Sequence, residues 1–223
     1  MNHADRHEEE ASLPRSRRRT YALQVGSVAV GGGAPISVQT MTKTDTRDVT
    51  ATVRQIHEVT QVGCDIVRLA VPDRDAALAL REIVPRADIP IVADIHFDHN
   101  LALAALKAGV DGLRLNPGNI GGAQKVAEVV AAARERQVPI RIGVNAGSLE
   151  DDIAVRYGHT PEALVESALR HVSILEDLDY REIKLSVKAS DVVRTVEAYR
   201  LLASRTEYPL HVGVTEAGTF LAG

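Results

Sequence analysis

Cysteine and aromatic residues are scarce in this sequence of 223 residues. The single cysteine, Cys64, excludes an internal disulfide, and the chain cannot by itself form a Cys-rich metal or iron–sulfur site. Tryptophan is absent, and aromatic residues make up 3% of the chain against 45% for all hydrophobic residues. The core must therefore be aliphatic, which suits strands rich in Val and Ile covered by helices rich in Ala and Leu.

Long apolar runs and a strong net charge are also absent. No stretch approaches the length of a transmembrane span, and the N-terminus lacks the apolar region of a secretory signal. The net charge of −4 gives no global electrostatic reason to bind nucleic acid or an anionic membrane. We therefore expect a cytoplasmic protein with no nucleic-acid or membrane partner, in which the polar residues 1–20 form a disordered tail.

From Pro35 onward, short Val- and Ile-rich runs alternate with longer segments of helical spacing. The predicted strands are 35–42, 65–71, 90–97, 112–118, 139–147, 182–190 and 209–218. The predicted helices are 48–62, 74–84, 99–108, 122–136, 161–177 and 191–205. Asp98 and Thr160 are suited to cap the helices that follow them, and Gly109 stands where a helix C-terminal glycine belongs. Before the repeats, "YALQVGSVAVGGGAP" predicts a β-hairpin.

Strict alternation of strand and helix indicates a parallel sheet, and the spacing of the strands favours an α/β fold of the (β/α)8 TIM-barrel type. A doubly wound open sheet is the alternative. A TIM barrel usually needs about 250 residues. We therefore expect residues 21–223 to form an incomplete TIM-barrel domain, truncated after the seventh strand, with exposed sheet edges that make it poorly soluble.

One face of the predicted strands is polar. Residues two apart share a face of a strand, and in each run one phase is Ile, Val or Leu. The other phase includes Arg68, Asp94, His96, Arg114, Asn116, Arg141, Asn145, Lys184, Ser186, Lys188 and His211. In a barrel this phase faces the interior, and active sites lie at the carboxyl ends of the strands.

Several cations converge there against one or two acids, so the polar phase predicts a bound anion. Arginine forks match phosphate oxygens, and a phosphorylated or diphosphorylated small molecule is the natural ligand. We expect Gly143, between Arg141 and Asn145, to leave room for it. The alternative is a structural network in which Asp94 pairs with Arg68 or Arg114.

The segment 116–122 and Cys64 could each have either a functional or a purely structural role. "NPGNIGG" (116–122) is suited either to hold a phosphate on its backbone amides or to form a plain turn, and the sequence does not decide between them. Cys64 stands between Gly63 and a predicted strand, where we expect a buried, inert thiol.

The amino-acid sequences of seven segments resemble those of a known family. "SVQTMTKTDTRDV", "IVRLAVP", "VADIHFDHNLAL", "LRLNPGNIG", "IRIGVNAGSLE", "KLSVKASDV" and "LHVGVTEAG" are similar, in this order, to the N-terminal barrel of the 4-hydroxy-3-methylbut-2-en-1-yl diphosphate synthase family. The resemblance implies an oxidoreductase of the non-mevalonate isoprenoid pathway. Such enzymes reductively open the ring of 2-C-methyl-D-erythritol 2,4-cyclodiphosphate and eliminate water, giving (E)-4-hydroxy-3-methylbut-2-enyl diphosphate.

The same resemblance implies roles for individual residues. Substrate binding falls to Arg68, Arg114, Asn116, Arg141, Asn145, Lys188 and His211. Catalytic roles fall to Asp94, His96 and, as a weaker candidate at the mouth of the cavity, Glu216. Arg47 and Lys184 are weaker candidates still.

In the family, electrons reach the substrate from flavodoxin or ferredoxin through a 4Fe–4S cluster, and full-length enzymes form homodimers. The cluster sits on three Cys and one Glu of a C-terminal domain that this chain lacks, and Cys64 is not one of the ligands. The chain alone is therefore expected to bind substrate without reducing it. The alternatives are a non-catalytic or defective phosphate-binding barrel, and a barrel enzyme like dihydropteroate synthase.

Overall fold

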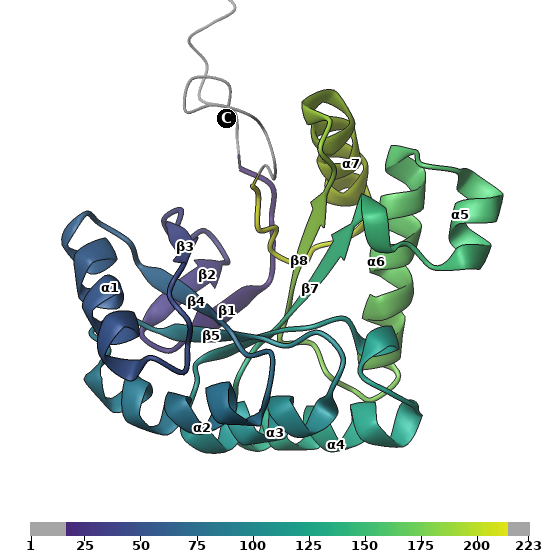
Figure 1. Cartoon of the computed structure of the whole chain (residues 1–223). Helices are drawn as coiled ribbons and strands as arrows, with labels where there is room; N and C mark the ends of the chain where they lie inside the picture. The colour runs from purple at the N-terminus through teal and green to yellow at the C-terminus, as the bar shows by residue number, and fades with distance from the viewer. Residues whose placement is uncertain (1–16, 214–223) are drawn as a thin grey trace, which may run out of the picture.

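The structure, a computed structural model, describes residues 17–213, and its main feature is a curved sheet of six parallel strands in the order β3-β4-β5-β6-β7-β8 (Figure 1). The strands are β3 (Gln39–Met41), β4 (Ile66–Ala70), β5 (Ile91–Asp94), β6 (Gly112–Arg114), β7 (Ile140–Asn145) and β8 (Ile183–Lys188). The helices, which lie along the outside of the sheet, are α1 (Val49–Gln61), α2 (Arg74–Ile83), α3 (His99–Ala108), α4 (Ala123–Glu135), α5 (Asp151–Tyr157), α6 (Pro161–Glu176) and α7 (Val192–Arg205).

This arrangement confirms the predicted TIM-barrel fold. Consecutive strands are neighbours throughout the sheet, and the helices cover its outer face (Figure 1). The doubly wound alternative is wrong, because such a sheet reverses its strand order and carries helices on both faces.

The alternation of residues along β7 shows how the core forms. Ile140, Ile142 and Val144 are fully buried in the main hydrophobic cluster together with Leu164 and Ala168 of α6. The polar residues of the same strand point the other way, into the barrel. Burial of the aliphatic phase against the helices therefore fixes the inward direction of the polar phase.

Helix ends follow the predicted caps. The Asp98 carboxylate accepts a hydrogen bond from the Asn100 amide at 2.8 Å, and the Thr160 hydroxyl accepts one from the Ala163 amide at 3.3 Å. Gly109 ends α3 with a φ of 93°, in the left-handed region that favours glycine.

Three predicted strands, 35–42, 90–97 and 112–118, are too long by three or more residues at one end, and the second of them ends in the structure at Asp94. The segment 35–42 forms β3 only over Gln39–Met41, because β3 pairs with β4 alone within the described residues. Its first apolar residues stay exposed, with Ile36 82% and Val38 56% accessible. The segment 112–118 ends as a strand at Arg114, and Pro117–Asn119 forms a turn of 3-10 helix.

The predicted seventh strand, 209–218, is described only as far as residue 213. There Leu210 makes a parallel bridge to Leu185 of β8. Helix α5 was not predicted, because it has seven residues and buries only Ile153. No helix among residues 17–213 is long and apolar enough to cross a membrane.

The predicted hairpin is formed by β1 (Ala22–Val25) and β2 (Val28–Gly31). Val25 packs with Ile66 and Val92, which face the interior near the amino ends of β4 and β5. The hairpin therefore fills the barrel at the amino ends of the strands and leaves the carboxyl ends for the site.

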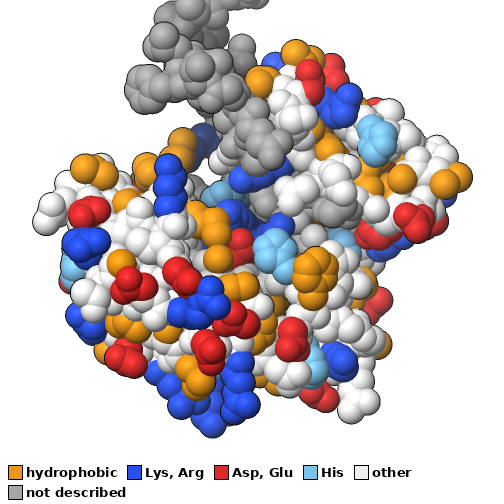
Figure 2. Space-filling view, in the orientation of Figure 1, with side chains coloured by type: hydrophobic (Ala, Val, Ile, Leu, Met, Phe, Trp, Pro, Cys, Tyr) orange, Lys and Arg blue, Asp and Glu red, His pale blue; other side chains and the backbone are white. Residues whose placement is uncertain are grey.

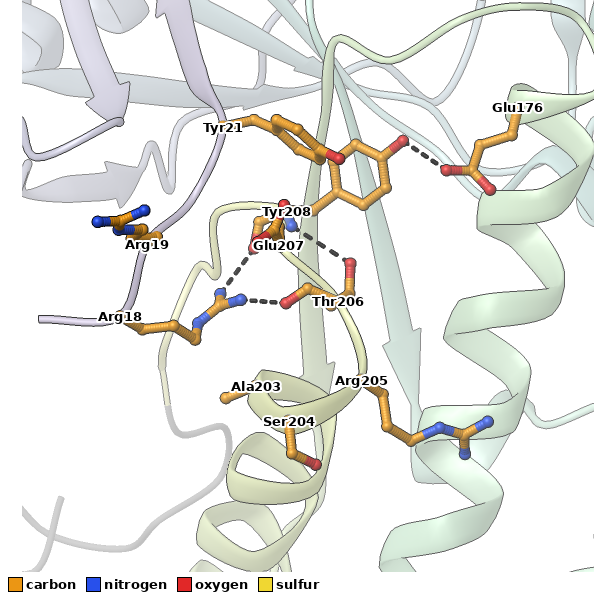
Figure 3. Close-up of a pocket in the computed structure, with 10 residues that line it drawn as sticks. All are labelled: Arg18, Arg19, Tyr21, Glu176, Ala203, Ser204, Arg205, Thr206, Glu207 and Tyr208. Carbon is orange, nitrogen blue, oxygen red and sulfur yellow. Dashed lines mark hydrogen bonds between the residues drawn. The ribbon is translucent and has the colours of Figure 1, made fainter.

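Residues 17–20, part of the predicted tail, make defined contacts (Figure 3). Arg18 donates hydrogen bonds to the carbonyl oxygens of Thr206 and Tyr208, and the rings of Tyr21 and Tyr208 are 5.2 Å apart. Arg18, Tyr21 and Tyr208 line a surface cavity of about 560 Å³. The Arg18 guanidinium already donates its hydrogen bonds to backbone carbonyls. The remaining residues of the predicted tail, 1–16, lie outside the described residues.

Candidate anion-binding site

The inward-facing polar residues converge at the carboxyl ends of β4 to β8. They enclose a cavity of about 240 Å³ lined by Arg68, Asp94, His96, Arg114, Arg141, Asn145, Ser186 and Lys188. In the space-filling view, Lys and Arg side chains gather around the hollow in the middle of the face (Figure 2). The structure thus brings most of the predicted site residues together, because consecutive parallel strands carry them at similar heights.

Arg141 is the least satisfied cation of this cavity. It lies directly opposite Arg114 in the pairing of β6 with β7, and it is 1% exposed. Its Nε and Nη1 atoms have no hydrogen-bond partner among the described residues. Burial, and then the neighbouring charges of Arg68 and Arg114, lower the pKa of Arg141 to about 9. Even so, a pKa of about 9 leaves Arg141 charged at neutral pH, so the site holds a buried positive charge with two unpaired nitrogen atoms among the described residues.

Asp94 is the carboxylate that partly balances these charges. Its Oδ1 lies 3.2 Å from Nη1 of Arg114, and its Oδ2 lies 3.5 Å from Nε of Arg68. His96 is close as well, with Nε2 3.6 Å from Asp94 Oδ1. The predicted structural network therefore exists, but one carboxylate faces four cations when Lys188 and Arg141 are counted. The cavity keeps a net positive charge that suits an anion.

The space beside Gly143 is filled by the side chain of Arg114 and not left open for a ligand. A Cβ atom at position 143 would lie 2.7 Å from Nε of Arg114, so the guanidinium fills the space beside the glycine. Arg114 Nη2 also donates to the Gly143 carbonyl at 3.0 Å, and Asn116 Oδ1 accepts from the Gly143 amide at 2.9 Å. The expectation that Gly143 leaves room for a ligand is wrong, because the guanidinium occupies that room.

Lys184 and His211 lie in a different cavity. This cavity, of about 510 Å³, opens between the β3 side of the sheet and residues 209–212. Lys184 is 3% exposed, and burial, followed by the charge of Arg141, lowers its pKa to about 7. Burial, and then Arg141 and Lys184, lower the pKa of His211 to about 2, so its imidazole is neutral. The two residues feel the charge of Arg141 but do not line the main cavity.

Two other predicted residues, Arg47 and Asn116, do not line the main cavity. Arg47 is exposed and pairs with Asp45 at 2.7 Å and Asp73 at 3.2 Å, which excludes it from the cavity. Glu216 lies outside the described residues. Asn116 is buried on the loop after β6 and contributes to the site through Gly143.

Two amides of the loop 116–122 donate hydrogen bonds within the protein, and part of the loop is a turn of 3-10 helix. The Gly118 amide donates to Nδ1 of His171 at 3.2 Å, and the Asn119 amide donates to the Asn116 carbonyl at 2.9 Å. His171 was not predicted to contribute to the site. The signal for it was a histidine on the apolar stripe of α6, where Ala168 and Leu175 are also buried.

Similarity to known proteins identifies the domain. The GcpE TIM-barrel domain family matches residues 20–223. The chain belongs to this family.

Curated relatives of this GcpE-family chain share a name, 4-hydroxy-3-methylbut-2-en-1-yl diphosphate synthase (flavodoxin). The Geobacter sulfurreducens protein is 62% identical over 208 residues, which cover 93% of this chain and 59% of the relative. The Thermodesulfovibrio yellowstonii protein is 60% identical over 203 residues, which cover 91% of this chain and 58% of the relative. The chain thus spans less than two thirds of the length of these relatives.

A solved structure supports the fold of the GcpE-family chain. N-acetylneuraminic acid (sialic acid) synthetase from Leptospira borgpetersenii superposes with a TM-score of 0.66 at 13% identity, covering 93% of this chain and 74% of the other. At such low identity the likeness concerns the fold alone.

The residues of the GcpE-family chain do not fit an iron–sulfur cluster. Among residues 17–213, no group of three or more His, Cys, Asp or Glu side chains is placed to hold a metal ion. Cys64 is buried, as predicted, and its Sγ donates to the Ile66 carbonyl at 3.1 Å. One cysteine in 223 residues cannot supply a set of three thiolate ligands.

Proposed function

We propose that the chain is the substrate-binding part of a 4-hydroxy-3-methylbut-2-en-1-yl diphosphate synthase. Its substrate would be 2-C-methyl-D-erythritol 2,4-cyclodiphosphate, and the reaction a reductive ring opening with loss of water. The observation that carries the proposal is the buried guanidinium of Arg141, which has two nitrogen atoms without a partner beside Arg114. Oxygen atoms of a diphosphate would supply those partners.

The cavity would act mainly by binding and orienting the diphosphate. Arg68, Arg114, Arg141 and Lys188 surround the space that it would fill. When the C–O bond to phosphate breaks, the bridging oxygen becomes a terminal phosphate oxygen and its negative charge grows. Cations that are already fixed in place stabilise such a developing charge without reorganising. The chain would therefore favour ring opening as well as binding.

Other residues of the cavity would orient the substrate and handle protons. Asn116 uses its Oδ1 atom on Gly143, so its Nδ2 group is the part available to donate to a phosphate oxygen. Asp94 and His96, 3.6 Å apart, are the candidates for holding or moving a proton when water leaves. Glu216 remains a predicted member of the site, whereas His211 lies in the neighbouring cavity and does not line this one.

The electrons would have to come through groups that residues 1–223 do not provide. The relatives' name points to flavodoxin as the donor, in preference to ferredoxin. Because the chain does not fit a 4Fe–4S cluster, no reducing step is assigned to its residues. Homodimer formation and a cytoplasmic location stay predictions.

Calorimetry with the cyclodiphosphate and with inorganic pyrophosphate tests the proposal. The chain should bind both, and Arg114→Gln and Arg141→Gln should each weaken binding by about 10- to 100-fold, the value of one charge-assisted hydrogen bond. Arg47→Gln is the matched control and should bind like the original chain, because Arg47 is outside the cavity. Absence of binding by the original chain, or equal binding by all three variants, would refute the proposal.

A further inference from the structure

His171 contacts the loops that follow β6 and β7 without lining the cavity itself. It lies on α6 and is 3% exposed. Its Nδ1 atom accepts from the Gly118 amide at 3.2 Å, on the loop that follows β6. Its Nε2 atom lies 3.1 Å from Oε1 of Glu150, which ends the loop after β7. The first loop carries Asn116 and the second begins at Asn145.

The contacts determine where the imidazole carries its proton. Because Nδ1 accepts from an amide, it has no hydrogen, and the neutral ring carries its proton on Nε2. Nε2 lies 3.1 Å from Oε1 of Glu150 without forming a hydrogen bond to it, and both carboxylate oxygens of Glu150 are buried without a hydrogen-bond partner among the described residues. Burial lowers the pKa of His171, in opposition to the nearby Glu150 charge, which is consistent with a neutral ring.

The fit between His171 and the first loop is close. A Cβ atom at position 118 would lie 2.7 Å from Cε1 of His171, so only glycine lets the turn rest on the ring. The turn sets the position of Asn116, whose Oδ1 accepts from the Gly143 amide. Gly143 in turn accepts from Arg114 through its carbonyl. A chain of four hydrogen-bonded or contacting groups thus joins His171 to the cavity.

We propose that His171 and Glu150 form a positioning pair that holds the loops after β6 and β7 so that Asn116 stays hydrogen-bonded to Gly143 beside Arg114, which lines the substrate cavity. This inference rests on the proposed function. His171 does not touch the cavity, so it acts through Gly118 and Asn116. Without the pair the turn would lose its fixed support, and Asn116 would lose its orientation.

Two substitutions distinguish the roles of the two ring nitrogen atoms of His171. The amide of His171→Asn can place an oxygen near the Nδ1 position and keep the acceptor for Gly118. The amide of His171→Gln can reach the Nε2 position and keep a donor for Glu150, but it removes the Gly118 acceptor. By calorimetry with the cyclodiphosphate, His171→Gln should bind about 10-fold more weakly, the value of one hydrogen bond, and His171→Asn should bind within about 3-fold of the original chain.

A double-mutant cycle tests whether His171 acts through Asn116. In an Asn116→Ala background, His171→Gln should cause no further loss of affinity, because the group that it positions is gone. Equal losses in both His171 variants, or full additivity with Asn116→Ala, would show a general structural role and overturn the inference. If the original chain does not bind the cyclodiphosphate, the proposed function itself fails.

Nuclear magnetic resonance of the original chain needs neither a variant nor a ligand. The ring nitrogen shifts of His171 should show a neutral imidazole protonated on Nε2, and the Gly118 amide should exchange slowly with solvent. A ring protonated on Nδ1, or a rapidly exchanging Gly118 amide, would overturn the inference even if both His171 variants failed to fold.

Discussion

Arg114 and Arg141 lie directly opposite each other on β6 and β7, and only Arg114 has a carboxylate partner. Two like charges at paired positions of a sheet repel each other. Asp94 and the Gly143 carbonyl hold Arg114, while Nε and Nη1 of Arg141 have no hydrogen-bond partner among residues 17–213. The ligand-free fold therefore carries an electrostatic cost that an anion would relieve.

Replacing Arg141 should separate stability from binding. Arg141→Met keeps most of the side-chain volume and removes an unpaired buried charge, so the free energy of unfolding should stay equal or rise by about 1–4 kcal/mol. Affinity for pyrophosphate should fall. Arg114→Met, the contrasting variant, should lose stability because it leaves Asp94 without its closest cation. Urea denaturation with calorimetry measures both effects, and a loss of stability in Arg141→Met would contradict the prediction.

Lys184 should make stability depend on pH. Burial lowers its pKa from 10.5 to about 7, so above pH 7 the unfolded chain binds a proton that the folded chain does not. Stability should therefore rise with pH between about 7 and 9, by at most about 1.4 kcal/mol per pH unit.

Urea denaturation across that pH range, without ligand, checks the Lys184 prediction. Lys184→Met should flatten the rise. Lys107→Met, a change at an exposed lysine, should keep it. An unchanged pH slope in Lys184→Met would show that this amine is not the source.

Gly143 should be needed for the position of Arg114. In Gly143→Ala the new methyl group would meet Nε of Arg114 at 2.7 Å, so the guanidinium must move. We expect about 1–3 kcal/mol of lost stability and about 10-fold weaker binding of pyrophosphate. Gly147→Ala is the control, since a Cβ there meets nothing within 4 Å. Calorimetry that finds equal affinity in the two variants would disprove the role given to Gly143.

The open side of the sheet should promote self-association. β3 pairs only with β4 among the described residues, and Ile36 beside it is 82% exposed. Edge strands with exposed apolar residues associate with other edges. Ile36→Lys should reduce the apparent mass measured by light scattering as the concentration rises. Val155→Lys, at a residue 88% exposed on α5, should not, and equal behaviour of both variants would rule out this edge.

Much of the fold followed from local patterns. Ile140, Ile142 and Val144 alternate with polar residues, and burying the aliphatic side against helices leaves one orientation for Arg141. Caps at Asp98 and Thr160 depend on atoms a few residues away. Such short-range relations can be inferred from the order of residues alone.

The details of the site depended on distant contacts. His171 meets Gly118 across 53 positions of the chain, and Gly143 makes room for a guanidinium from another strand. The residues next to Gly118 and Gly143 in the sequence do not indicate which distant side chain each glycine contacts.

By itself, the sequence determined the strand–helix alternation and the cationic inner face, because both arise from periodicity along the chain. Only the tertiary structure decided which charges are paired. The single carboxylate of Asp94 pairs with Arg114 and Arg68, whereas two nitrogen atoms of Arg141 have no hydrogen-bond acceptor among the described residues. Pairing depends on distances of a few ångströms between strands, and those distances exist only after the sheet has curved.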